Sequence, residues 1–349
     1  QTDVAGNTSQ ATAFTFTYDT QAAAPTVALV TDSGSSSVDK VTNVGTLAVS
    51  GTEVGATVQY SSDNVNWATT APTLAQGGNT VYVRQTDVAG NTSQATAFTF
   101  TYDTQAAAPT VALATDSGSS AVDKITNVGT LAVTGTETGA LVQYSSDNVN
   151  WATTAPTLAQ GSNTVYVRQT DVAGNTSQAT AFTFTYDTQA AAPTVALVTD
   201  SGSSSVDKIT NVGTLAVSGT EVGATVQYSA NGSDGWSTTA PTLSQGGNTV
   251  YVRQIDVAGN TSQATAFTFT YDTQAAAPTV ALVTDSGFSA DDKVTNDGTL
   301  AVSGTEVGAT VEYSANGTDG WSTTAPTLSQ GGNTVYVRQI DIAGNTSRS

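Results

Sequence analysis

The sequence predicts an all-β protein made of tandem sandwiches, and three observations lead to that prediction. Its opening motif, QTDVAGNTSQ, recurs with little change about every 84 residues, beginning at Gln1, Gln85, Gln169, Gln254 and Gln339. Apolar and polar residues alternate in short runs such as AFTFTYD, which is the pattern of a half-buried strand. Clusters of Gly, Asn, Asp and Pro separate these runs, and no segment has the periodicity of an amphipathic helix.

Each period is long enough to form a small domain with its own core. We place the boundaries in the QAAAP stretches, each of which precedes a recurring PTVAL. We therefore expect the last strand of a preceding repeat at 1–20, followed by four repeats, of which the fourth lacks its own last strand. The four repeats span 21–104, 105–188, 189–273 and 274–349.

Seven strand-like segments can be counted in the second repeat. They are PTVALAT, TLAVTGT, ALVQYSS, a short one at NWATT, another around PTLAQ, NTVYVRQT and SQATAFTFTYD. In the first repeat's copy of the last segment, Phe98, Phe100 and Tyr102 share one face, which is expected to be the buried one. Seven short strands in about 84 residues indicate an antiparallel sandwich of immunoglobulin type.

An odd number of strands places the two termini of a repeat at opposite ends. The predicted architecture is therefore a series of seven-stranded immunoglobulin-like β-sandwiches arranged end to end. One tryptophan per repeat is expected to pack in the core or at its rim, namely Trp67, Trp151, Trp236 and Trp321.

Composition excludes several classes of function. The chain contains no Cys, no Met and no His, so disulfides, thiolate metal sites and His-dependent nucleophilic catalysis are unavailable. A formal net charge of −19 argues against nucleic acid as a partner. No apolar run approaches the length of a membrane span, so insertion into a membrane is not expected. An enzyme is also not expected, because identical acidic positions in every repeat suit a structural role.

Strand order predicts where the acidic residues gather. We call the end at which the chain enters a repeat its upper end. In the second repeat the first strand runs down to Asp116, while the second and sixth strands run up to Glu137 and Asp171. Each junction between repeats should therefore collect five carboxylates. In chain order, the three sets are Asp32, Asp39, Asp103, Glu137 and Asp171; Asp116, Asp123, Asp187, Glu221 and Asp256; and Asp200, Asp207, Asp272, Glu306 and Asp341. The upper end of the first repeat carries the corresponding Asp19, Glu53 and Asp87.

Such clusters need a counter-charge. Two carboxylates about 4 Å apart repel by roughly 4 kcal/mol at an effective dielectric constant near 20. A set of oxygen ligands without His or Cys favours Ca²⁺, which accepts six to eight oxygens in tolerant geometry. We therefore predict Ca²⁺ as the bound cofactor. The alternative is that these Asp residues only stabilise turns and solvated loops.

The ordered motifs of the second repeat resemble those of a known family. These are Asp116-Ser-Gly, Asp123-Lys-Ile-Thr-Asn127, Gly135-Thr-Glu137, Asp171-Val-Ala-Gly-Asn175 and Asp187-Thr followed by Pro193. They look like the bacterial immunoglobulin-like tandem repeats in the extender regions of giant RTX-type adhesins. The resemblance covers essentially the whole chain and recurs in every repeat. Lys124 stands where that family often has Gly, so a positive φ is not expected at this position.

The resemblance implies a calcium-stiffened extender, exported by type I secretion, that projects a terminal binding domain from the bacterial cell surface. The implied location is extracellular, and neighbouring repeats of the same chain are the principal partners. Two alternatives remain open. One is a module that itself adheres to a surface or binds a glycan, and the other is a subunit of a strand-donating surface filament.

The two ends of the sequence suggest a further contact. Residues 9–19, SQATAFTFTYD, repeat the strand that the fourth repeat lacks, and Phe14, Phe16 and Tyr18 would be exposed if this segment stood alone. An open sheet edge is a template for strand addition. We therefore expect head-to-tail self-association through residues 9–19.

Overall fold

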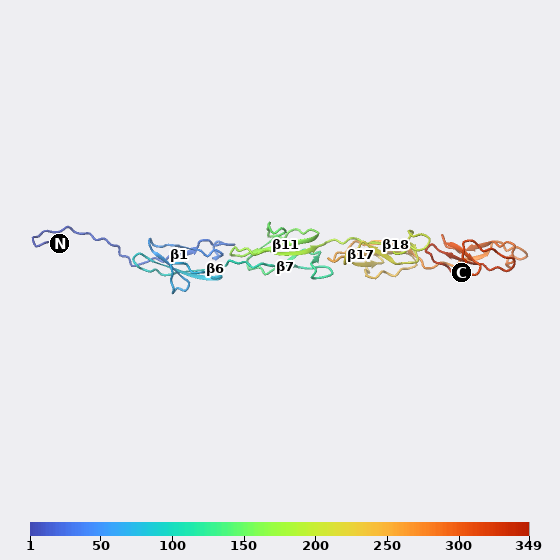
Figure 1. Ribbon diagram of the computed structural model, residues 1–349, viewed down its shortest axis with the longest axis horizontal. Helices are drawn as coiled ribbons and strands as arrows, with labels where there is room; N and C mark the ends of the chain where they lie inside the picture. The colour runs from blue at the N-terminus through green and yellow to red at the C-terminus, as the bar shows by residue number, and fades with distance from the viewer. Residues whose placement is uncertain (349) are drawn as a thin grey trace. The chain divides into compact units, whose positions relative to one another are not determined.

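The computed structural model describes residues 1–348, which form strands and no helix, as the sequence predicts (Figure 1). None of these residues forms a helix with the length and apolarity that a membrane span needs. The chain divides into two compact units, each described by itself below. The first unit comprises residues 1–114 and 130–184, and the second comprises 115–129 and 185–349.

The first repeat contains six strands in two sheets. They are β1 (Thr26–Leu29), β2 (Val41–Thr42), β3 (Leu47–Ser50), β4 (Thr57–Ser61), β5 (Gly77–Thr86) and β6 (Thr96–Tyr102). Strands β1 and β3 form an antiparallel pair, and the other four form a sheet in the order β2-β6-β5-β4. Within that sheet only the short β2 runs parallel to its neighbour, β6.

The same succession of strands recurs in the second and third repeats. The second has β7 (Thr110–Leu113), β8 (Ile125–Thr126), β9 (Leu131–Thr134), β10 (Leu141–Ser145), β11 (Gly161–Thr170) and β12 (Thr180–Tyr186). The third has β13 (Thr194–Leu197), β14 (Ile209–Thr210), β15 (Leu215–Ser218), β16 (Thr225–Ser229), β17 (Gly246–Ile255) and β18 (Thr265–Tyr271).

The core lies between the two sheets of a repeat. In the first repeat it is centred on Val81, Val83 and Phe100, which are nearly inaccessible to solvent. Phe98 and Tyr102 pack against this cluster from the same face of β6, whereas Thr99 is exposed and shares a hydrogen bond with Thr80. The predicted buried face of this strand is therefore confirmed.

The structure differs from the predicted seven strands in the middle of each repeat. In the second repeat, the PTLAQ segment (156–160) forms no strand, and NWATT contributes only an isolated bridge between Tyr144 and Ala152. Pro156 cannot donate a hydrogen bond to a ladder. The side chain of Asn163 instead accepts from Ala159 N at 3.0 Å and donates to Ala159 O at 2.7 Å, which takes the place of strand pairing. The two-residue β8 was not predicted, because two residues show no periodicity.

The tryptophans are half-buried, and each lies against an arginine. The Arg168 guanidinium carbon is 4.1 Å from the ring centre of the half-buried Trp151, which is the geometry of a cation–π contact. The other three repeats have the same Arg–Trp pair.

The fourth repeat has fewer strands. It contains β19 (Thr279–Leu282), β20 (Leu300–Ser303), β21 (Thr310–Ser314) and β22 (Tyr336–Ile340), joined as two separate pairs. Strand β22 is half as long as its counterpart β17, because the first half of β17 is paired with the last strand of its repeat. Residues 9–18, which repeat the sequence of that last strand, form no strand here.

Candidate metal centre

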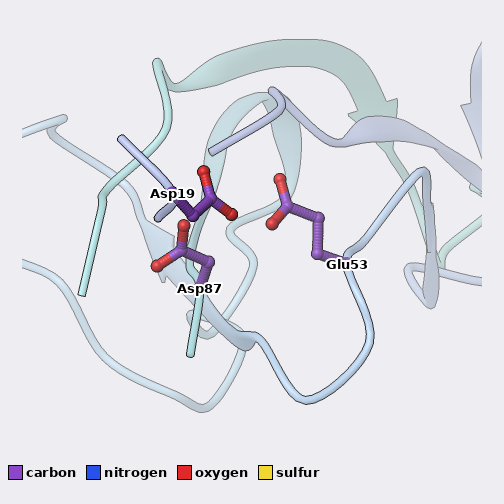
Figure 2. Close-up of side chains that lie close together, drawn as sticks. All are labelled: Asp19, Glu53 and Asp87. Atoms are coloured by element: carbon purple, nitrogen blue, oxygen red, sulfur yellow. The ribbon is translucent and has the colours of Figure 1, made fainter. Parts of the chain in front are cut away.

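Three carboxylates converge at the upper end of each repeat. In each group the nearest carboxylate oxygens all lie within 4.8 Å of one another, and we refer to these groups as the acidic triads. The four triads are Asp19, Glu53 and Asp87; Asp103, Glu137 and Asp171; Asp187, Glu221 and Asp256; and Asp272, Glu306 and Asp341. Figure 2 shows the first triad, in which the three side chains point toward a common centre.

Each triad joins three separate parts of the chain. In the second repeat, Asp103 directly follows β6, Glu137 lies in the turn after β9, and Asp171 opens the turn after β11. This is the placement that strand direction predicted for these three residues. Asp171 is nearly buried, whereas Asp103 and Glu137 are half-buried, so the group combines an inner carboxylate with two outer ones.

Asn175 orients the inner carboxylate. Its backbone N–H donates to Asp171 Oδ1 and its side-chain amide donates to Asp171 Oδ2, both at 2.8 Å. The same amide also donates to the backbone carbonyl of Asp103 at 2.9 Å. One asparagine therefore ties the linker to the turn that carries the inner carboxylate.

A buried glutamine supports Glu137, one of the two outer carboxylates. Gln169 is fully buried, accepts from Glu137 N at 2.9 Å and donates to Ala107 O at 2.7 Å. Ala107 N in turn donates to Glu137 Oε1 at 2.6 Å. These bonds hold the linker and the turn after β9 in one arrangement, which positions Glu137 beside Asp171. The equivalent glutamines of the other repeats make the same contacts, namely Gln85, Gln254 and Gln339.

Direct contacts between repeats lie beside the triads. In the first unit, Ser33 Oγ donates to Ala173 O at 2.8 Å, and Asn43 Nδ2 donates to Asn175 Oδ1 at 3.2 Å. Gly34 approaches so closely that a Cβ on it would lie 2.0 Å from Val172 O, so only glycine fits there. In the second unit, Ser117 and Ser201 make the equivalent bonds to Ala258 and Ala343.

The triads have little compensating positive charge. The chain has 28 Asp and Glu residues against 9 Lys and Arg residues, and Arg338 pairs with Glu312, which lies outside the triads. Three carboxylates at this spacing repel one another by several kcal/mol. In the first triad, the side-chain amide of Asn91 holds the pKa of Asp87 below its usual value, with further help from backbone N–H groups. These hydrogen bonds therefore favour the charged form of Asp87.

This electrostatic arrangement predicts an acid titration. Because its pKa is lower in the folded chain than in the unfolded one, Asp87 contributes stability above its usual pKa, and that stability is lost as pH falls through the lower folded pKa. In the presence of chelator, carbon-detected NMR should place the midpoint of the Asp87 carboxyl below 3.8. The Asn91→Ala variant should raise this midpoint. A midpoint above 3.8 in the unmodified chain would show that repulsion from Asp19 and Glu53 outweighs the hydrogen bonds from Asn91.

The remaining predicted acids do not join these triads. The structure gathers three of the five carboxylates expected at each junction, and Asp32 and Asp39 of the first repeat are instead engaged in their own loop. Asp32 Oδ2 accepts from Lys40 N at 2.9 Å, and Asp39 Oδ1 accepts from Val41 N at 3.0 Å. The corresponding pairs are Asp116 with Asp123 and Asp200 with Asp207.

One carboxylate oxygen in this loop has no hydrogen-bond partner. Asp32 Oδ1 is buried and unpaired, and the same holds for Asp116, Asp200 and Asp285. A buried carboxylate oxygen without a partner is costly. The same oxygen is buried and unpaired in all four repeats, so it could accept a bond from water or bind a cation. As metal ligands, these loop acids remain predictions.

The prediction that Lys124 would not adopt a positive φ is wrong. Lys124 adopts φ 61°, and the three equivalent lysines are also positive. Its N–H donates to Asp116 Oδ2 at 2.9 Å, and its carbonyl accepts from Thr185 N at 2.8 Å. These two bonds require the left-handed conformation and offset its steric cost in a residue that is not glycine.

Sequence reasoning missed Gln169 and Ser33. Both recur at the same position in every repeat, and that recurrence was the available signal. A glutamine between strand residues does not by itself indicate burial, because the side chain is usually exposed.

Three stretches of the chain match the model of one domain family, described as the bacterial Ig-like domain. They are residues 21–104, 105–188 and 189–273. No curated protein matches the chain.

Proposed function

Because the chain belongs to the bacterial Ig-like domain family, we propose that it is a calcium-stiffened extender that projects a terminal binding domain from a bacterial cell surface. Domains of this family are often found in cell-surface or extracellular proteins, and tandem copies are consistent with a structural rather than a catalytic role. The finer proposal is that this is the extender region of an adhesin of RTX type.

The recurrence of one acidic triad beside every linker carries the proposal. The same three carboxylates occur at the upper end of all four repeats. In the second, third and fourth repeats, they lie beside direct hydrogen bonds to the preceding repeat. A recognition site would need to occur only once, whereas stiffening requires the same device at every junction.

The residues fit a hard divalent cation. Asp103, Glu137 and Asp171 offer only carboxylate oxygens, and these oxygens lie within 4.8 Å of one another. Ca²⁺ accepts such a set together with backbone carbonyls and water, whereas Mg²⁺ demands a stricter octahedron. A bound ion would neutralise the repulsion between the linker residue Asp103 and the two carboxylates of the repeat below it.

The proposal predicts that calcium changes the dimensions of the chain. The longest strand of the first repeat has 10 residues and spans about 33 Å, so a stiff series of such repeats has a large maximum dimension. Small-angle scattering should show a larger maximum dimension and a narrower distribution of distances with calcium than with chelator. Magnesium is the matched control and should have a smaller effect. Equal dimensions with calcium and with chelator would contradict the stiffening role.

A further inference from the structure

The third and fourth repeats each contain one Asn-Gly pair, Asn231-Gly232 and Asn316-Gly317, and this pair occurs nowhere else in the sequence. Each asparagine lies two residues after a strand, β16 or β21, and its side chain is exposed to water. Asparagine is a thermolabile residue. It is most labile before glycine, because glycine has no Cβ to keep its backbone nitrogen away from the preceding side-chain carbonyl carbon.

The loop after β16 holds the amide of Asn231 at both of its atoms. The oxygen, Oδ1, accepts from Ser233 N and Asp234 N, each at 3.0 Å. The nitrogen, Nδ2, donates to Asp234 Oδ1. The following Gly232 N donates to Oγ of the buried Ser229 at 3.1 Å. These bonds fix both the carbonyl group that would be attacked and the nitrogen that would attack it.

Packing fixes the glycine as well. Gly232 adopts φ 75°, and a Cβ on it would lie 2.7 Å from a ring atom of Tyr251. To reach the side-chain carbonyl carbon of Asn231, the nitrogen of Gly232 must leave the hydroxyl of Ser229, and the contact with the ring opposes that movement. The closed loop therefore protects Asn231, and a local opening removes the protection.

The first and second repeats have the reverse arrangement of acid and amide. In the first repeat, Asp63 stands where the third has Asn231, and Asn66 stands where the third has Asp234. Asp63 Oδ1 accepts from Val65 N at 2.8 Å and from Asn66 N at 2.7 Å. Asn66 Nδ2 donates to Asp63 Oδ2 at 2.7 Å. The turn therefore forms equally well around a carboxylate, which has no ammonia to lose.

We propose that Asn231 and Asn316 are sites of spontaneous deamidation, gated by the opening of their loops. In the open loop, Gly232 N attacks Asn231 Cγ, as a well-placed intramolecular nucleophile does. The bond from Gly232 N to Cγ forms, and the bond from Cγ to Nδ2 breaks. The proton that Gly232 N loses is made up on the leaving nitrogen through solvent, so ammonia departs and a succinimide ring remains. Water then opens the ring at either carbonyl and leaves aspartate or isoaspartate.

Neither product can restore the closed loop. Aspartate at position 231 would place a second carboxylate against Asp234, where the amide now donates, and two carboxylates at that distance repel each other. Isoaspartate adds an atom to the main chain, which displaces Gly232 from the ring of Tyr251. Deamidation thus makes a transient opening permanent in the third and fourth repeats, whereas the corresponding loops of the first and second repeats are unaffected.

Peptide mass spectrometry of the full chain, incubated at mildly alkaline pH, tests the proposal. The peptides around the two sites are distinguishable, because one contains Ser233 and the other Thr318 at the same position. In urea that unfolds the chain, both asparagines should deamidate at least about tenfold faster than in buffer without urea. Equal rates in the two solutions, or no deamidation in urea, would overturn the proposal.

The Ser229→Ala variant tests the gate itself. It removes the hydroxyl that accepts from Gly232 N and donates to Asp234 O at 2.6 Å. In the folded chain, deamidation of Asn231 should become at least about fivefold faster. Asn316 of the same molecule is the matched control, and its rate should not change. In urea, the variant and the unmodified chain should deamidate Asn231 equally fast. An unchanged rate at Asn231 in the folded variant, or an equal increase at Asn316, would contradict the gating.

Discussion

The Asp103→Asn chain is expected to bind one calcium ion fewer than the unmodified chain under conditions that fill all four triads. The substitution keeps the shape of the side chain and an oxygen that accepts the bond from Gln105 N, so the local turn should persist. It removes one of three negative charges around the proposed ion. Charge–charge energies at this distance indicate a loss of attraction of about 3 kcal/mol or more. This loss corresponds to at least about a hundredfold weaker calcium binding.

The loss should be confined to one junction. Asp103 belongs to none of the other three triads, so the calcium affinities of those triads should be unchanged. The matched control is Asp291→Asn, which makes the same charge change at an acid outside the triads and should retain every ion. If Asp103→Asn binds as many ions as the control with equal affinity, the second triad is not a calcium site.

The Gln169→Ala variant should lower the free energy of unfolding of the second repeat by about 2–5 kcal/mol. The substitution leaves a cavity and removes the partners of Glu137 N and Ala107 O. Hydrogen exchange can report on this repeat alone, because its segment around TETGA differs in sequence from the other repeats. Protection across β9 and β10 should fall by at least about tenfold.

A second glutamine provides the control for this effect. Gln143 is half-buried on β10 and accepts a bond from Arg168 Nε at 3.0 Å. The Gln143→Ala variant should change stability by less than about 1 kcal/mol. Equal effects of the two substitutions would show that the buried glutamine has no special role in holding the linker.

Local patterns were sufficient to predict the strands that carry the core. The alternation of Phe98, Phe100 and Tyr102 with threonines identified the buried face of β6 correctly. Strand direction then brought Asp103, Glu137 and Asp171 to the same end of the second repeat, where the structure finds them together. Both inferences depend on the two-residue period of a strand and on the direction of the chain, which are visible in sequence.

Features that depend on distant contacts were not predictable in this way. Gln169 is buried because it bonds to Ala107 and Glu137, which lie 62 and 32 residues away in the sequence. Asp32 was placed at the correct end of its repeat, but its bond to Lys40 N keeps it out of the triad. Strand direction gives the end of a sandwich at which a side chain lies, whereas the neighbours it meets there depend on loop conformation.

Isothermal titration of the full chain with calcium tests the central claim most directly. Four triads of the same composition predict saturable calcium uptake with about four equivalent strong sites, and magnesium should bind more weakly. The loop acids with unpaired oxygens would add further, weaker sites. Absence of calcium uptake at millimolar free calcium would contradict the claim that the acidic triads hold calcium at the junctions.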